Sequence, residues 1–129
     1  MEVTMKQVLD LLNPDEPDYF EAAKIGAGAL IHLNQLVMGA DGLLASKAAY
    51  LASLIDDPKS IDVLQNAAKS KHPEVRVAAA SGAKNLIKKN LVKDDQRTVD
   101  NLLNLLKNDS DPGVRKWVQK SSSLRDNTK

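Results

Sequence analysis

The amino-acid sequence predicts an all-α protein built from repeated pairs of helices, and three observations support this. Apolar residues recur with a period of 3.6 along most of the 129-residue chain. Only four residues are aromatic, so the side chains that favour β-strands are scarce. A short motif containing proline, valine and arginine occurs twice, with the two prolines 39 residues apart. The length fits one compact domain over residues 1–129.

The first half of the chain predicts one short and two longer helices. Thr4 and Gln7 have the spacing of a capping box, which predicts a cap helix over residues 3–12. A long apolar helix is expected over residues 18–38, because an aspartate begins this segment and a glycine follows it. A further helix is expected over residues 41–55.

The second half of the chain predicts four helices. Three of them begin at an X-Pro pair, namely Asp57-Pro58, His72-Pro73 and Asp111-Pro112, and proline suits the first helical position because its missing N–H costs nothing there. The fourth helix is marked by an apolar stripe from Val99 to Leu106, after a polar loop over residues 90–96. No β-hairpin signal is present in the sequence.

The helices of the second half contain an internal repeat. Pro73-Glu74-Val75-Arg76 matches Pro112-Gly113-Val114-Arg115, and a weaker copy begins at Asp41. Each copy follows one apolar helix and opens another, so the repeating unit is a helical hairpin. The hairpin is expected about three times, over residues of about 18–56, 57–90 and 95–125.

These motifs resemble the HEAT-like repeats of α-solenoids, whose second helix typically begins with Asp-Pro or a similar pair, then Val-Arg and an alanine-rich run. The resemblance implies a short right-handed α-solenoid of about three hairpins with an N-terminal cap helix. It also implies hydrogen bonds between neighbouring units through the arginine and the aspartate before the proline. The first unit lacks the arginine and the second has His72 in place of the aspartate, so we expect these links to be incomplete.

Three glycines inside expected helices have a packing interpretation. Glycine in a helix costs about 0.5–1 kcal/mol relative to alanine. We therefore expect Gly26, Gly28 and Gly82 to lie where a side chain would clash with a neighbouring helix.

The residues that usually carry chemistry are missing or have structural interpretations. The chain has no cysteine, which excludes disulfides and thiolate sites. His32 and His72 lack the spacing of a metal site, and Gly26-Ala27-Gly28 lacks the rest of a phosphate-binding loop. The acidic pairs lie at helix junctions, where they cap helices. We therefore predict no enzyme activity, catalytic residue, metal or cofactor. The chain shows neither a signal peptide nor a membrane span, so a cytoplasmic location is expected.

The charge distribution points to a protein partner. Residues 1–64 carry four basic and ten acidic side chains, a formal charge of −6, whereas residues 65–129 carry fourteen basic and seven acidic, a charge of +7. The family resemblance implies a scaffold or adaptor, and the asymmetry favours an acidic protein as partner. The candidate partner-binding residues are Arg76, Lys84, Lys88, Arg115, Lys116, Trp117 and Lys120.

Each of these residues also has a structural interpretation. The arginines fit hydrogen bonds between units, and the tryptophan fits the core of the last unit. The lysines, together with Lys89 and Lys93, fit a solvated face. Binding of nucleic acid or another polyanion through the basic half is the alternative function, but stacking aromatic residues and a reading motif are lacking. An accessory role in an enzyme is a weaker alternative. The charge asymmetry also allows head-to-tail self-association.

Overall fold

The computed structural model describes the backbone of residues 2–89 and 91–127, and the side chains of these residues up to Leu124. Every regular element in this part of the chain is a helix. The α-helices are α1 (Met5–Leu12), α2 (Tyr19–Ala22), α3 (Leu30–Val37), α4 (Gly42–Leu54), α5 (Lys59–Ala68), α6 (Pro73–Ile87), α7 (Lys93–Leu106) and α8 (Pro112–Asn127). Two 3-10 helices, η1 (Ala23–Ile25) and η2 (Ala27–Ala29), lie between α2 and α3.

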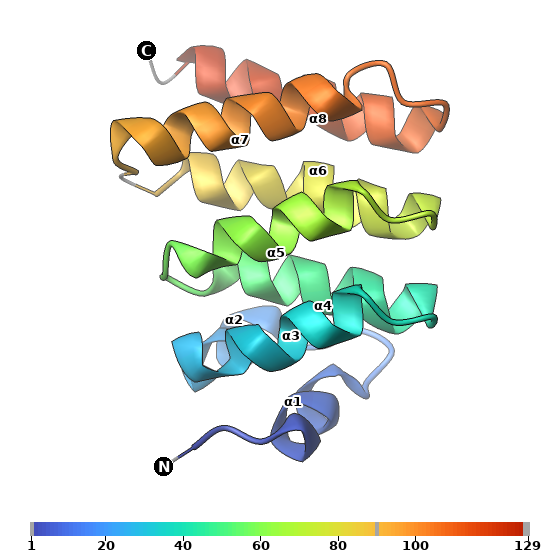
Figure 1. The fold of residues 1–129 in the computed structure, drawn as a ribbon, viewed down its shortest axis with the longest axis vertical. Helices are drawn as coiled ribbons and strands as arrows, with labels where there is room; N and C mark the ends of the chain where they lie inside the picture. Colours follow the sequence, from blue (N-terminus) through green and yellow to red (C-terminus); the bar gives the residue numbers. More distant parts are fainter. Residues whose placement is uncertain (1, 90, 128–129) are drawn as a thin grey trace.

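The helices form two rows that are stacked along the long axis of the molecule (Figure 1). One row contains α3, α5 and α7, and the other contains α2, α4, α6 and α8. The pairs α3–α4, α5–α6 and α7–α8 are three consecutive hairpins, and α1 lies at the N-terminal end against α3 and α4. The prediction of an all-α stack of helical hairpins is therefore confirmed.

Small residues bring α4 and α6 close together. Ala48 and Ala52 of α4 and Ala79 of α6 are fully buried. A Cβ atom at Gly82 would lie 3.0 Å from the Cβ of Ser53 and 3.3 Å from a methyl carbon of Leu64. The expected close approach at Gly82 is thus confirmed, because a side chain there has no free space.

The continuous helix that we expected over residues 18–38 is wrong. The chain leaves α2 through η1, turns at Gly26 and re-enters helix through η2 and α3. Gly26 has φ +84° and ψ −174°, a conformation that is essentially restricted to glycine. A Cβ atom added there would meet no atom within 4 Å. The packing interpretation therefore fails for Gly26, whereas at Gly28 a Cβ would lie 3.1 Å from a methyl carbon of Val3.

Replacement of Gly26 by alanine is expected to destabilise the protein by about 1–2 kcal/mol, because the backbone conformation alone is unfavourable for an L side chain. The transition midpoint in thermal denaturation should fall by roughly 5 °C. Ala27→Ser, at an exposed neighbour with ordinary negative φ, is the matched control and should change it little. Equal midpoints for Gly26→Ala and the wild type would contradict the assignment.

Polar side chains cross the two boundaries between hairpins. We call the boundary between α3–α4 and α5–α6 the first seam, and that between α5–α6 and α7–α8 the second seam. At the first seam, Asn85 Nδ2 donates to Ser53 Oγ (2.9 Å) and Asn66 Nδ2 donates to Asn34 Oδ1 (2.8 Å). At the second seam, the buried Ser121 Oγ donates to the carbonyl of Ala80 (2.8 Å). These bonds satisfy groups that would otherwise be costly to bury.

Candidate interaction surface

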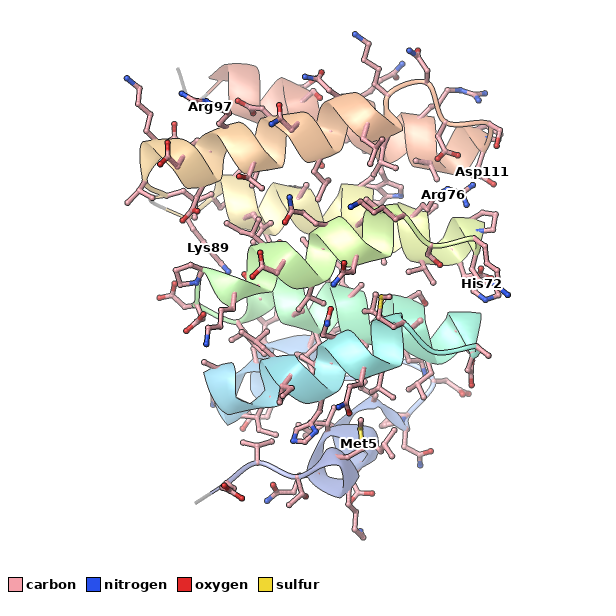
Figure 2. All side chains as sticks on the ribbon, viewed as in Figure 1. Met5, His72, Arg76, Lys89, Arg97 and Asp111 are labelled. Carbon is pink, nitrogen blue, oxygen red and sulfur yellow. The ribbon has the colours of Figure 1, made fainter. Side chains whose placement is uncertain are left out.

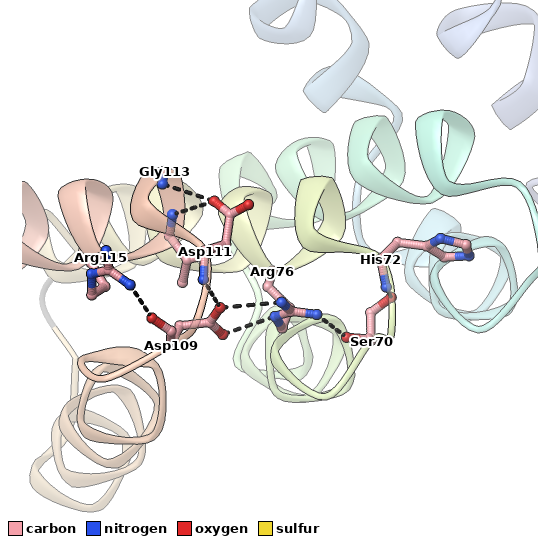
Figure 3. Close-up of polar contacts among 8 residues, drawn as sticks. Ser70, His72, Arg76, Asp109, Asp111, Gly113 and Arg115 are labelled. Carbon is pink, nitrogen blue, oxygen red and sulfur yellow. Dashed lines mark hydrogen bonds and ion pairs between the residues drawn. The ribbon is translucent and has the colours of Figure 1, made fainter.

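Arg76 links the second and third hairpins through an ion pair (Figure 3). Its Nε donates to Oδ2 of Asp109 at 2.8 Å and its Nη2 donates to Oδ1 at 3.1 Å. The third nitrogen, Nη1, donates to the carbonyl of Ser70 at 2.9 Å. The two charged side chains are only 16% and 10% exposed. The bidentate geometry fixes the guanidinium plane, so Arg76 is occupied within the chain.

Asp109 is held by backbone groups as well as by Arg76. Its Oδ1 accepts from the N–H of Asp111 at 2.9 Å. The hydrogen bonds from Arg76 lower the pKa of the Asp109 carboxyl below its ordinary value, and burial opposes this effect. Asp111 has a different role, because its Oδ1 accepts from the N–H groups of Gly113 (2.8 Å) and Val114 (3.2 Å) and caps α8.

The carboxylate between units is thus Asp109, and not the aspartate directly before the proline. The family resemblance had directed attention to Asp111. The repeat offered a signal for Asp109, because the 39-residue offset makes it the equivalent of Ser70. In the structure, each of these two side chains accepts from the backbone N–H two residues later. The pairing of Asp109 with Arg76 depends on how the hairpins stack, and the local sequence pattern carries no information about that stacking.

No such ion pair crosses the first seam among the described residues. Counted from the helix N-caps Asp41 and His72, Ala45 stands where Arg76 stands in the next hairpin. Ser70 stands where Asp109 stands, and its Oγ accepts from the N–H of His72 (3.1 Å). Both members of the ion pair are therefore replaced at this seam, so neither leaves an unpaired charge.

Arg115 repeats half of the Arg76 arrangement at the end of the stack. Its Nη1 donates to the carbonyl of Asp109 at 2.6 Å, as Nη1 of Arg76 does to Ser70. Arg115 is exposed, and no ion pair among the described side chains includes it. The hydrogen bond from Nη1 therefore orients the guanidinium. Its other edge, formed by Nε and Nη2, has no carboxylate partner in this part of the chain.

The predicted lysines lie on two neighbouring helices of one row. Lys84 and Lys88 are one turn apart near the C-terminal end of α6, and Lys116 and Lys120 are one turn apart on α8. Lys84 is half-buried and the other three are exposed. Since α6 and α8 pack together, the structure brings the two lysine pairs onto adjacent helices. We call these four residues the lysine surface.

Trp117 lies beside this surface. Its side chain is half-buried and packs against the apolar core. The ammonium of Lys120 lies 4.6 Å from the centroid of the indole ring, a cation–π distance. Trp117 therefore contributes to the core and also reaches the basic surface.

Lys89 was expected on a solvated face with the other lysines of this segment, but it is half-buried. Its Nζ donates to the carbonyl of Ile55 at 2.6 Å, which ties the end of α6 to the end of α4. Burial lowers the pKa of the ammonium, and the carboxylates of Asp56 and Asp57 act in the opposite direction. These three residues line an open groove of about 460 Å³. Helical spacing offered a signal, because Lys89 lies three positions after the buried Leu86.

The two histidines lie on different elements, His32 within α3 and His72 at the N-cap of α6. In the described part of the chain, no group of three or more histidine, cysteine, aspartate and glutamate side chains is arranged to hold a metal ion. A ring nitrogen of His32, Nε2, is 2.8 Å from the carbonyl oxygen of Val3.

Among the residues that the structure describes, no helix is both long and apolar enough to cross a membrane.

Successive hairpins stack on one another, and an ion pair joins the second to the third. This architecture is that of a helical-repeat protein. A family model described as HEAT repeats matches residues 32–123. This match covers more than half of the chain, which therefore belongs to the HEAT-repeat family.

A solved structure supports the same fold. It is described as the complex of CpcE and CpcF of phycocyanin lyase from Nostoc sp. PCC7120. The similarity covers 97% of this chain and 79% of that chain, with a TM-score of 0.72 and 20% sequence identity. At this identity the likeness concerns the fold. No curated protein matches the chain in sequence.

Proposed function

We propose that this HEAT-repeat chain is a non-enzymatic scaffold or adaptor that binds an acidic protein through the lysine surface. The observation that carries the proposal is the position of four lysines on or beside the adjacent helices α6 and α8, namely Lys84, Lys116 and Lys120 within the helices and Lys88 at the C-cap of α6. Stacked hairpins offer an extended binding surface without a chemical site. The similar fold of a protein described in a complex with another chain is consistent with this role.

The physical basis of the proposed recognition is electrostatic complementarity. Exposed lysines attract carboxylates over a distance set by the screening length, which shortens from about 10 Å at 0.1 M salt to about 3 Å at 1 M. Binding should therefore weaken as salt increases. Trp117, beside the lysines, offers an apolar contact of the type that often anchors interfaces.

The double variant Lys116→Glu/Lys120→Glu is expected to lose most of the partner binding, because it reverses half of the lysine surface. The measurement is recovery of bound protein from the native host at low and high salt. Lys69→Glu/Lys71→Glu is the matched control, since it changes the charge equally at exposed positions of the α5–α6 connection. Undiminished binding to every recovered partner by the α8 variant would overturn the proposal.

The same lysine surface supports a second candidate function, binding of nucleic acid or another polyanion. Single-stranded DNA of mixed sequence and heparin are suitable probes. A steep linear fall of log affinity with log salt, together with saturation of the surface by these probes, would favour this function. Failure of both probes to compete with the protein partner would exclude it.

A further inference from the structure

The open edge of Arg115 has a filled counterpart in the same molecule. At Arg76, Nη1 holds a loop carbonyl while Nε and Nη2 hold the carboxylate of the next hairpin. At Arg115, Nη1 holds the equivalent loop carbonyl, that of Asp109. The guanidinium is thus already oriented for a carboxylate, and binding one would cost little further ordering of this side chain.

The position of the missing carboxylate can be read from the filled site. Asp109 lies two residues before Asp111, the residue that caps α8. The first helix of the same row, α2, is capped by Asp18, whose Oδ1 accepts from the N–H three residues later at 3.2 Å, as Asp111 does at the same distance. Two residues before Asp18 is Glu16, which is exposed. The acidic turn before α2 therefore has the register of the turn before α8.

The two ends of this helix row also have opposite charge. The turn at the N-terminal end carries Asp15 in addition to Glu16, while Glu21 is paired with Lys24 (2.9 Å). By contrast, α8 carries Lys116 and Lys120 beside Arg115. Each end has an aromatic residue as well. Phe20 of α2 is 81% exposed, and Trp117 of α8 is half-buried.

The geometry points to head-to-tail association of two copies of this chain, in which the carboxylate of Glu16 in one copy binds the Nε and Nη2 edge of Arg115 in the other. The contact repeats the Arg76–Asp109 pair between molecules, with the turn before α2 in the place that the turn before α8 takes within one chain. It is heterologous, so each copy keeps one free end and longer assemblies can grow. This inference rests on the proposed function, since it names a second copy as an acidic partner of the basic end.

Sedimentation equilibrium of the purified chain tests the association. At about 0.05 M salt, the weight-average mass should rise above the 14.0 kDa of the monomer as the protein concentration increases. At about 1 M salt it should return to the monomer value. A mass that stays at the monomer value under all these conditions overturns the inference. It does not affect the proposed protein binding, which the Lys116→Glu/Lys120→Glu recovery experiment tests separately.

Charge reversal identifies the contact. Arg115→Glu and Glu16→Arg should each weaken the association by about tenfold or more, and the chain carrying both changes should associate again because the pair is restored with reversed signs. Arg97→Glu is the matched control, since Arg97 is exposed and lies at the other end of the last hairpin from Asp111 (Figure 2). Circular dichroism confirms folding of each variant. Lack of recovery in the double variant, or an equal effect of Arg97→Glu, overturns the assignment of this contact.

Discussion

Replacement of Gly82 by leucine is expected to lower the free energy of unfolding by about 3 kcal/mol or more, because the site has no room for a side chain. The added Cβ alone would lie 3.0 Å from the Cβ of Ser53 in the neighbouring helix. A Cβ atom is attached directly to the backbone, so rotation of the Ser53 side chain cannot move it away. The remaining atoms of leucine would have to separate α4 from α6. Ser53 cannot easily turn away, because its Oγ accepts from Asn85 and donates to the carbonyl of Tyr50.

The measurement is the midpoint of thermal or urea denaturation, and a loss of this size corresponds to roughly 10 °C or more in the thermal midpoint. Gly82→Ala should destabilise less, because only the Cβ must be accommodated. Lys88→Leu introduces the same side chain at an exposed position of the same helix end and should have little effect. If Gly82→Leu unfolds at the wild-type midpoint, the assignment of Gly82 as a helix-crossing point fails.

Replacement of Asp109 by asparagine is expected to cost about 2 kcal/mol, between the values typical of exposed and of buried ion pairs. Asparagine keeps the shape of the side chain but removes the charge that compensates the largely buried guanidinium of Arg76. It also leaves only one oxygen to serve both Arg76 and the N–H of Asp111. Urea denaturation at pH 7 measures the effect, and Arg115→Gln at the exposed counterpart should change stability far less.

The same carboxylate predicts an acid dependence of stability. Arg76 lowers the folded-state pKa of Asp109 below the ordinary value of 3.8, so the folded protein binds fewer protons than the unfolded chain in this range. The contribution of the pair is complete above the ordinary pKa and disappears as the pH falls through the lower folded-state pKa. We expect the difference between wild type and Asp109→Asn to shrink below about pH 4. Parallel curves of stability against pH would contradict this.

The sequence contained enough information for the class of fold but not for every element. Apolar stripes and X-Pro pairs report local helix geometry, so they located the hairpins and the resemblance to HEAT repeats, which the family match confirms. The break at Gly26 was missed because the segments on both sides are rich in apolar residues. A glycine in such a segment has two physical explanations, a close approach or a positive φ, and only the backbone separates them.

The polar contacts between hairpins were predicted less completely than the helices. The repeat placed Arg76 and Arg115 at equivalent positions, and it implied hydrogen bonding between units. It did not identify Asp109 as the partner, because 33 residues separate the two side chains and their contact depends on the stacking of whole hairpins. The solvated position expected for Lys89 is wrong for the same reason, since its acceptor is a backbone carbonyl that has no sequence signature.

The unequal distribution of ion pairs between the two seams makes the second seam the more sensitive of the two to acid. Among the described residues, only the second seam contains an ion pair, Arg76–Asp109, while the first seam relies on close packing and on hydrogen bonds such as Asn85–Ser53. In a repeat protein each hairpin is held only by its neighbours. Protonation of Asp109 should therefore loosen α7–α8 and leave the preceding hairpins joined. Acid should therefore weaken first the attachment of the hairpin that carries Arg115, Lys116 and Lys120.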